Sequence, residues 1–444
     1  MRRLLLVSAL FAAACGDAPI YESDARPIQL AHAPVSSGGA AQGALLAKFR
    51  AGASTPWLLV DTGYTMSGLN PGACPMAEPR AHTDTLEVLD AVLPTAPLRA
   101  VFRDVRLWDL CAGPAGDANT QVGGVLGNDL LSHYSLALRL PSDAGQSPTM
   151  TLYTTLPASE SRLAEDGYAV IGFLSRGSAE LVSASGAGLG SVSGTRPVVR
   201  TCAAPREFAS DEVEEICEKG EANLRASGAN LLLGISTGHG PLVLSASAWA
   251  RITGQAAVAP DGSEPPLYSP LVSEPVPAHW VTLPRLALMD RGDSDDDWPG
   301  ACVELARSRR IEWTLANQAT GACYQPCDSD GSLARTSLAY LELGGALAAA
   351  VVSDTSDLMR TLNVDVPPGA QIDGLIGAAA LAGTRLEIDY PSGPDGRLTA
   401  VCESGADRKA CYAAPRCPRL SGSGQSHACF GLPPQSELAP VCPK

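Results

Sequence analysis

The sequence predicts a mainly β protein made of two duplicated lobes with a central cleft. The chain has 444 residues, which is more than one ordinary hydrophobic core usually spans. It contains 44 glycines and 35 prolines but only 5% aromatic residues, a composition that favours many short strands and turns. Residues 124–141 and 374–391 align without a gap at an offset of 250 residues. Such a match between two parts of one chain indicates an internal duplication.

The composition also limits the classes of partner. With 45% hydrophobic and 18% charged residues, the chain can bury a sizeable core and is not disordered overall. The net charge of −15 argues against a nucleic-acid partner and leaves no polybasic patch for a membrane surface.

The N-terminus predicts export. Residues 1–14 contain two arginines followed by the apolar run Leu4–Ala14, and Cys15 comes next, which is typical of a secretory signal. The Ala-Ala-Ala-Cys end of this run resembles a bacterial lipoprotein lipobox, and that resemblance implies that Cys15 becomes the lipidated first residue. An ordinary signal peptide cut nearby is the alternative. No later apolar run approaches the ~20 residues that span a bilayer, so a lipid is the only membrane contact expected.

By the same resemblance we expect anchoring to a bacterial membrane, with the outer membrane favoured and the body facing the periplasm or the exterior. Residues 15–29 would then form a polar tether between the lipid and the folded body.

The two aligned stretches carry the same sequence of elements. Each has a Gly-x-x-Gly motif that ends at Gly127 or Gly377, a short segment of helical character, and an alternating strand closed by proline. The duplication should extend upstream of these motifs. There, Trp57–Val60 leads into Asp61-Thr62-Gly63, and residues 232–235 lead into Ser236-Thr237-Gly238.

Ser236 therefore occupies the counterpart of Asp61. Gly234-Ile-Ser236-Thr-Gly238 also fits the G-x-S-x-G turn of a serine nucleophile. That turn is followed directly by a helix, whereas residues 241–244 look extended here and a helical pattern begins only at Ala246. We therefore favour the duplicated loop over the nucleophile turn.

These motifs resemble those of the aspartic peptidases, and two such lobes in one chain resemble the pepsin type. The first lobe, with 66 residues from Asp61 to Gly127, resembles the more compact retropepsin lobe. The resemblance implies two β-barrel lobes, at 30–160 and 161–400. It also implies one aspartate per lobe, the pair sharing a proton over a water because two close carboxylates cannot both ionise. One would act as the base and the other as the acid in peptide hydrolysis; Thr62, Gly63, Thr237 and Gly238 would shape the two loops.

Ser236 departs from that pattern, because a hydroxyl can hold a water but cannot carry the shared proton. The segment after Asp61 also lacks the tyrosine-bearing hairpin that covers the cleft in pepsin-like enzymes. We expect a monomeric pseudopeptidase that binds a peptide or protein in its cleft, with no cofactor. An active aspartic endopeptidase using Asp61 with an unidentified partner is the alternative. His239 is either an acid/base group or, as we favour, a solvated turn histidine.

The second lobe has about 75 more residues between its motifs than the first, which predicts an insertion at about 251–335. Thirteen cysteines minus Cys15 leave an even twelve, and export favours disulfides. We predict the pairs Cys74–Cys111 and Cys202–Cys217, and a disulfide-rich C-terminal tail at 401–444; the other pairings stay open. Zinc at the remaining closely spaced cysteines is disfavoured because no C-x2-C pair or H-x3-H partner accompanies them, so we expect no metal site.

Overall fold

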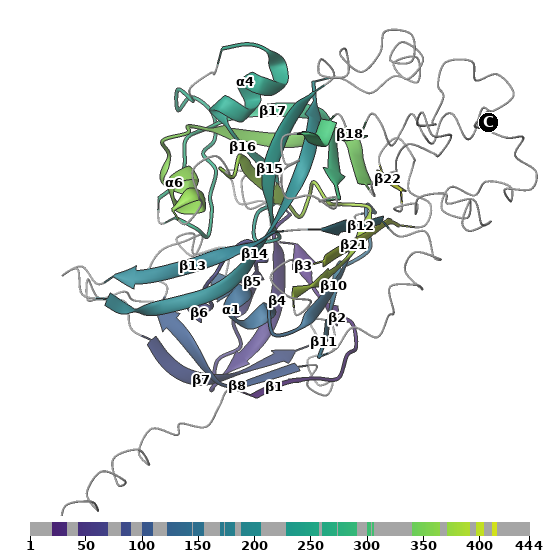
Figure 1. The fold of residues 1–444 in the computed structure, drawn as a ribbon. Helices are drawn as coiled ribbons and strands as arrows, with labels where there is room; N and C mark the ends of the chain where they lie inside the picture. Colours follow the sequence, from purple (N-terminus) through teal and green to yellow (C-terminus); the bar gives the residue numbers. More distant parts are fainter. Residues whose placement is uncertain are drawn as a thin grey trace, which may run out of the picture.

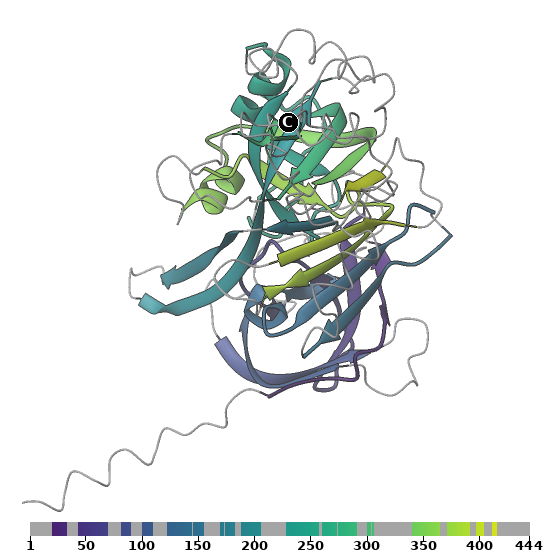
Figure 2. The same cartoon turned by 45° about the vertical axis from the view of Figure 1, so that its right-hand side comes forward.

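The computed structural model confirms a mainly β protein. The residues it describes, apart from short gaps inside these ranges, are 20–32, 43–69, 81–89, 100–109, 122–154, 169–205, 228–290, 300–305, 340–364, 371–390, 397–403 and 411–414. In both views the early strands and the later strands form two bodies, with a third group of strands between them (Figures 1 and 2).

The first body is an eight-stranded sheet made by the early part of the chain. In order of pairing, its strands are β1 (Ile20–Ser23), β8 (Ala100–Asp109), β6 (Gly68–Leu69), β9 (Val122–Leu126), β5 (Trp57–Val60), β4 (Leu45–Ala51) and β3 (Ala31–His32), with β7 (Ala81–Leu89) joined to β4 and β8.

The second body is another eight-stranded sheet. Its strands are β13 (Leu174–Val182), β14 (Gly188–Ala204), β15 (Ala229–Ser236), β19 (Gly374–Gly377), β16 (Leu242–Ser245), β18 (Tyr340–Val352) and β17 (Ala278–Met289), with β22 (Cys411–Ala414) joined to β18.

The two sheets repeat one pairing pattern. β5 runs parallel to β9, β6 pairs antiparallel with β9 and parallel with β8, and β7 pairs antiparallel with β4 and β8. β15, β19, β16, β18, β17 and β14 repeat every one of these pairings in the same orientation. The duplication seen at an offset of 250 residues is therefore also a duplication of topology.

The third sheet joins the two halves. Its order is β12 (Ala169–Gly172), β21 (Arg397–Cys402), β20 (Thr384–Asp389), β10 (Ser135–Leu140), β11 (Thr149–Tyr153) and β2 (Ile28–Gln29). At its centre, Leu136 pairs with Ile388 and Leu138 with Leu386, so equivalent residues exchange partners about the pair Ala137–Glu387. This reciprocity is what a local two-fold axis between the halves produces.

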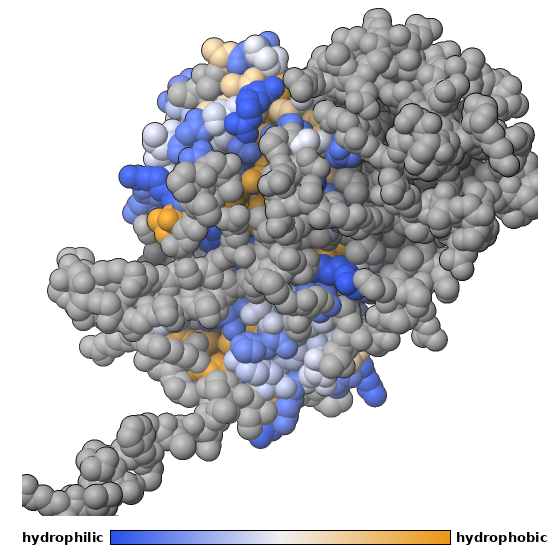
Figure 3. Space-filling model, in the orientation of Figure 1, coloured by the Kyte–Doolittle hydropathy of each residue, from blue (hydrophilic) through white to orange (hydrophobic). Residues whose placement is uncertain are grey.

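Side-chain alternation explains the core. In β10 and β20 the leucines and isoleucine that face one side are fully buried and join the large hydrophobic cluster shared by both bodies. Phe49, Phe102 and Tyr134 lie in the same cluster, the last two in edge-to-face contact at 5.6 Å. On the face drawn in Figure 3, the described surface mixes hydrophilic side chains with small apolar patches.

Three helices are placed by local signals. The pattern that begins at Ala246 is α4 (Ala246–Thr253), whose N-cap Ser245 accepts a hydrogen bond from the Ala248 amide at 3.1 Å and whose C-cap Gly254 has φ 68°. α1 (Asn128–Leu131) follows Gly127 as expected, and α6 (Asp357–Asn363) precedes β19. None of the helices among the described residues has the length and apolar character that crossing a bilayer requires.

Three expected boundaries differ from the structure. Part of the tether predicted at 15–29 forms β1 and β2, which pair with β8 and β11. Part of the tail predicted at 401–444 forms β22 on the second sheet. The insertion predicted at 251–335 contains β17, the counterpart of β7, so the extra residues are spread around a strand of the repeat.

The predicted pair Cys202–Cys217 is wrong, because Cys202 bonds to Cys302 with a Cα–Cα distance of 4.8 Å. Cys202 lies on β14, and the side-chain oxygen of Asn230 on neighbouring β15 accepts a hydrogen bond from the Cys302 amide at 2.8 Å. This contact holds residues 300–305 against β14. A second disulfide joins Cys402 to Cys411. Cys15, Cys74, Cys111 and Cys217 lie outside the described residues.

Candidate functional site

The two Thr-Gly loops meet between the halves of the molecule and exchange hydrogen bonds. The Thr62 hydroxyl donates to the carbonyl of Ile235 at 2.9 Å, and the Thr237 hydroxyl donates to the carbonyl of Val60 at 2.6 Å. The Thr62 amide also donates to the Thr237 hydroxyl at 3.3 Å. Each threonine thus binds the strand end of the opposite half, which is the arrangement expected of equivalent loops about a two-fold axis.

Glycine is required in these loops because the opposite loop fills the space of a side chain. A Cβ on Gly63 would lie 2.5 Å from the Cβ of Ser236, and one on Gly238 would overlap the carboxyl group of Asp61. A Cβ on Gly127 or on Gly377 would overlap the backbone of the chain beside it. The four glycines singled out in the sequence are therefore needed for close backbone approach.

Asp61 and Ser236 contact each other directly. The Ser236 hydroxyl donates to Asp61 Oδ1 at 2.7 Å, and the Gly63 amide donates to the same oxygen at 2.8 Å. Both side chains are fully buried. The other oxygen, Oδ2, is also buried and has no hydrogen-bond partner in the part of the chain that the structure describes.

His239 extends this contact into a chain of four side chains. Its Nδ1 lies 2.6 Å from the Ser236 hydroxyl oxygen, and its Nε2 lies 2.7 Å from the hydroxyl oxygen of Ser269. His239 is 1% exposed and Ser269 is 3% exposed. The expectation that His239 is a solvated turn histidine is wrong, because the turn folds inward and the ring fills the space between the two serines.

One assignment of protons satisfies the whole chain. Because a carboxylate only accepts, the Ser236 proton points to Asp61. The Nδ1–H of His239 then donates to Ser236, and Nε2 accepts from the Ser269 hydroxyl. Burial lowers the pKa of His239, against an opposing effect of Asp61, so the neutral ring is favoured. A neutral histidine fits this assignment without any rearrangement.

Further polar side chains support the Asp61 loop. Arg196 donates to the Gly63 carbonyl at 2.9 Å and to the Leu362 carbonyl at 3.3 Å. Asn128, the first residue of α1, donates to the Thr62 carbonyl. Burial, with the negative charge of Asp61 next in importance, raises the pKa of Tyr64 to about 12, so this phenol stays neutral beside the carboxylate.

Asp129 forms a second buried carboxyl group behind the loop. It accepts hydrogen bonds from the Ser67 amide at 2.9 Å and the Ser67 hydroxyl at 2.5 Å, and Ser67 in turn accepts from the Gly127 amide. Burial raises the pKa of Asp129 to about 6, although the bonds from Ser67 oppose the rise. Its hydrogen bonds are to Ser67, so the structure does not join it to Asp61 as a carboxyl pair.

The described residues offer no other candidate for the second acid. Asp354 accepts from the amide and hydroxyl of Ser247 at the start of α4, and it is exposed. No group of three or more His, Cys, Asp or Glu side chains in the described ranges could hold a metal ion. The site therefore consists of one carboxylate, two serines and one histidine.

Sequence comparison adds little to this geometry. No protein-family model matches the chain, and no curated protein matches it. Among solved structures, the chain is similar to the aspartic proteinase from Irpex lacteus. The two share 12% identity with a TM-score of 0.39, over 87% of this chain and 99% of that one. At this level the function must be argued from the site itself.

Proposed function

We propose that this protein is an aspartic-peptidase-like pseudopeptidase that binds a peptide or protein segment between its two halves without cleaving it. The repeated topology and the reciprocal threonine bonds support the family. The hydrogen bond from Ser236 to Asp61 supports the loss of catalysis, and it is the observation on which the proposal rests.

Peptide hydrolysis of the aspartic type needs two carboxyl groups that share one proton. Here Ser236 supplies a proton donor but no titratable group. Asp61 Oδ1 is already occupied by two donors, and Oδ2 is buried. The centre is thus a stable clasp between the halves rather than a poised acid and base.

A second candidate is an active endopeptidase in which His239 is the missing partner. The 2.6 Å contact between His239 and Ser236 favours it, since one hydroxyl then links a titratable ring to Asp61. In that case the imidazolium would return a proton through Ser236 to the leaving group. The favoured neutral state of the buried ring and the inaccessibility of Asp61 weigh for the binding function.

One experiment separates the two functions. The purified protein is incubated from pH 3 to pH 8 with a random decapeptide library, and bound peptides and new peptide termini are both measured by mass spectrometry. Binding without new termini supports the proposal, and we expect Asp61→Asn to change the bound set. Asp143→Asn, at an exposed turn, is the matched control. Cleavage that is lost in both Asp61→Asn and His239→Gln would instead establish the enzyme.

Localisation belongs to the same proposal. An exported lipoprotein would begin at a diacylated Cys15 and fractionate with membranes. Mass spectrometry of the mature N-terminus tests this, and an unmodified terminus beyond Cys15 would contradict it.

A further inference from the structure

A groove lies on the outer face of the sheet that joins the two halves. It is lined chiefly by Ala137, Arg139, Thr151, Tyr153, Arg385 and Glu403, and its volume is about 370 Å³. These residues alternate along their strands with the buried leucines of the core, so the groove and the core lie on opposite faces of one sheet. It uses none of the residues that surround Asp61.

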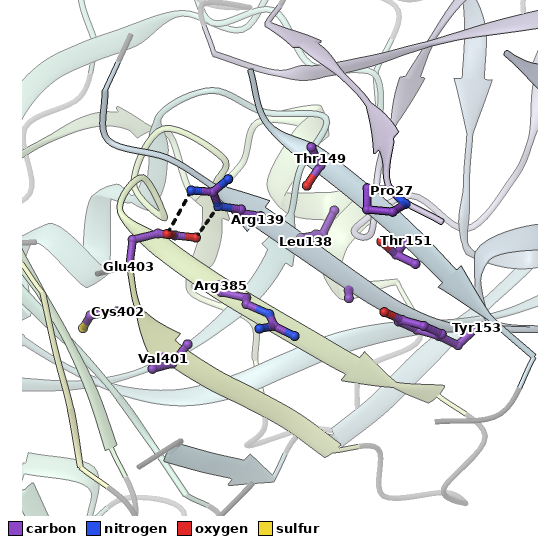
Figure 4. Close-up of a pocket in the computed structure, with 11 residues that line it drawn as sticks. Pro27, Leu138, Arg139, Thr149, Thr151, Tyr153, Arg385, Val401, Cys402 and Glu403 are labelled. Atoms are coloured by element: carbon purple, nitrogen blue, oxygen red, sulfur yellow. Dashed lines mark hydrogen bonds and ion pairs between the residues drawn. The ribbon is translucent and has the colours of Figure 1, made fainter. Parts of the chain in front are cut away.

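The groove is hollow because small side chains are ringed by large ones. Ala137 and Thr151 face each other across β10 and β11, and they are only 8% and 7% exposed. Longer side chains rise around them: Arg139 and Arg385 on one side and Tyr153 on the other (Figure 4). Val401 contributes a further apolar wall.

Two arginines meet at this groove. Arg139 and Arg385 are direct cross-strand partners in β10 and β20, a placement that is unfavourable for like charges unless anions lie close. Glu403 binds Arg139 through two bonds of 2.8 and 3.3 Å, and Glu387 binds Arg385 at 2.8 Å. These carboxylates hold the guanidinium groups in defined places.

The two guanidinium groups face different ways. In Figure 4 the Arg139 group turns toward Glu403, whereas the Arg385 group extends into the hollow on the side of Tyr153. A guanidinium has five N–H donors in a planar fork, so it can bind a further carboxylate while it keeps the one it already has. The hydroxyl groups of Thr149, Thr151 and Tyr153 add donors along β11.

From this arrangement we infer that the groove binds a small organic carboxylate. The carboxylate is held by Arg385 and the β11 hydroxyl groups, and its apolar body lies over Ala137 and Val401. The same chemistry is offered by a free organic acid and by the C-terminal carboxylate of a peptide. The inference does not rest on the function proposed for Asp61.

The test uses the full mature chain and three probes in calorimetric titrations: benzoate, the tripeptide Ala-Ala-Phe, and its C-terminal amide. We expect one or both carboxylates to bind and the amide not to bind. Benzoate alone would identify a site for free acids, and the tripeptide alone a site for peptide ends. Equal binding of the amide, or binding of no probe, would overturn the inference.

Variants place the binding in the groove. Arg385→Gln should weaken binding at least tenfold, because it removes the charge and keeps a side chain of similar polarity. Ala137→Leu should abolish it by filling the hollow while both arginines remain. Arg251→Gln is the matched control, since Arg251 is also about half exposed and ion-paired, with Asp373, but lies on α4. Binding unchanged by both Arg385→Gln and Ala137→Leu would refute the assignment.

Discussion

Replacing Ser236 with aspartate restores the second carboxyl group, but the structure predicts that this alone does not restore proton sharing. The new carboxyl would lie roughly 3 Å from Asp61, where two negative charges repel by about 5 kcal/mol at an effective dielectric constant of 20. A proton must therefore enter the site. Because His239 Nδ1 lies 2.6 Å from the Ser236 oxygen, the ring is the nearest base.

In Ser236→Asp, we therefore expect His239 to take that proton and form an ion pair with the new carboxylate. The ion pair raises the pKa of His239, whereas burial lowers it in the parent protein. The imidazolium neutralises one carboxylate, so the two carboxyl groups no longer share a proton. Only the double variant Ser236→Asp with His239→Gln leaves them to share one.

Two measurements test this reasoning. Histidine NMR titration should show His239 neutral at pH 7 in the parent and cationic in Ser236→Asp, with the partly exposed His279 as internal reference. Cleavage of the decapeptide library at acid pH should be at background in the parent and single variant, and at least tenfold higher in the double variant, since members of a catalytic pair act as a unit. Equal cleavage by the single and double variants, or a neutral His239 in Ser236→Asp, would refute the argument.

Three further predictions concern stability. Asp129 has a folded-state pKa raised to about 6, so its contribution to stability is complete below the unfolded value near 3.8 and is lost as the pH rises through 6. Asp129→Asn should remove this loss of about 3 kcal/mol, measured by urea unfolding at pH 4 and pH 7; an unchanged pH slope contradicts it. Cys202→Ser with Cys302→Ser opens a 100-residue loop and should lower the free energy of unfolding by about 4 to 5 kcal/mol; the reduced parent should match the variant. Thr237→Val leaves the buried Val60 carbonyl without its 2.6 Å donor and should cost about 1 to 3 kcal/mol; a loss below 0.5 kcal/mol in the same unfolding assay would show that the bond is replaced.

The repeat in the sequence predicted most of the fold that positions the site. The glycine motifs, the strands around them and the alternating segments at 136–141 and 386–391 depend on local patterns. Backbone approach at Gly63 and Gly238 follows from the same motifs. The facing of Ser236 and Asp61 was predicted because a duplication imposes symmetry, and symmetry relates residues far apart in the chain.

The rest of the site depends on contacts that no local pattern encodes. Ser269 lies 30 residues beyond His239, in a segment with no counterpart motif, and only the folded chain places it against the ring. His239 follows a glycine turn, and turn polarity alone favours exposure. Cys202 pairs across 100 residues because Asn230 holds residues 300–305 against the sheet, whereas the expected partner was merely the nearest in sequence.

A last prediction concerns how the joining sheet is fixed to the Asp61 loop. Tyr390 follows β20 directly, and its buried hydroxyl donates to Asn128 Oδ1 at 3.0 Å; Asn128 in turn donates to the carbonyl of Thr62. Since Tyr390 comes from one half and the loop from the other, this chain orients Asn128. Burial, with Asp61 as a smaller cause, raises the pKa of Tyr390, so the phenol remains a donor at every working pH.

Tyr390→Phe keeps the ring and leaves the Asn128 oxygen buried without its donor, which should cost about 1 to 3 kcal/mol of unfolding free energy. If the hydroxyl acts only through Asn128, Asn128→Ala should remove most of the additional effect of Tyr390→Phe, so that the double variant is less destabilised than the sum of the singles. Tyr153→Phe, on the opposite face of the same sheet, is the control and should leave unfolding unchanged within 0.5 kcal/mol. Strict additivity of Tyr390→Phe and Asn128→Ala would mean that the sheet and the loop are fixed independently, and that the two halves are held at the site by the threonine and serine bonds alone.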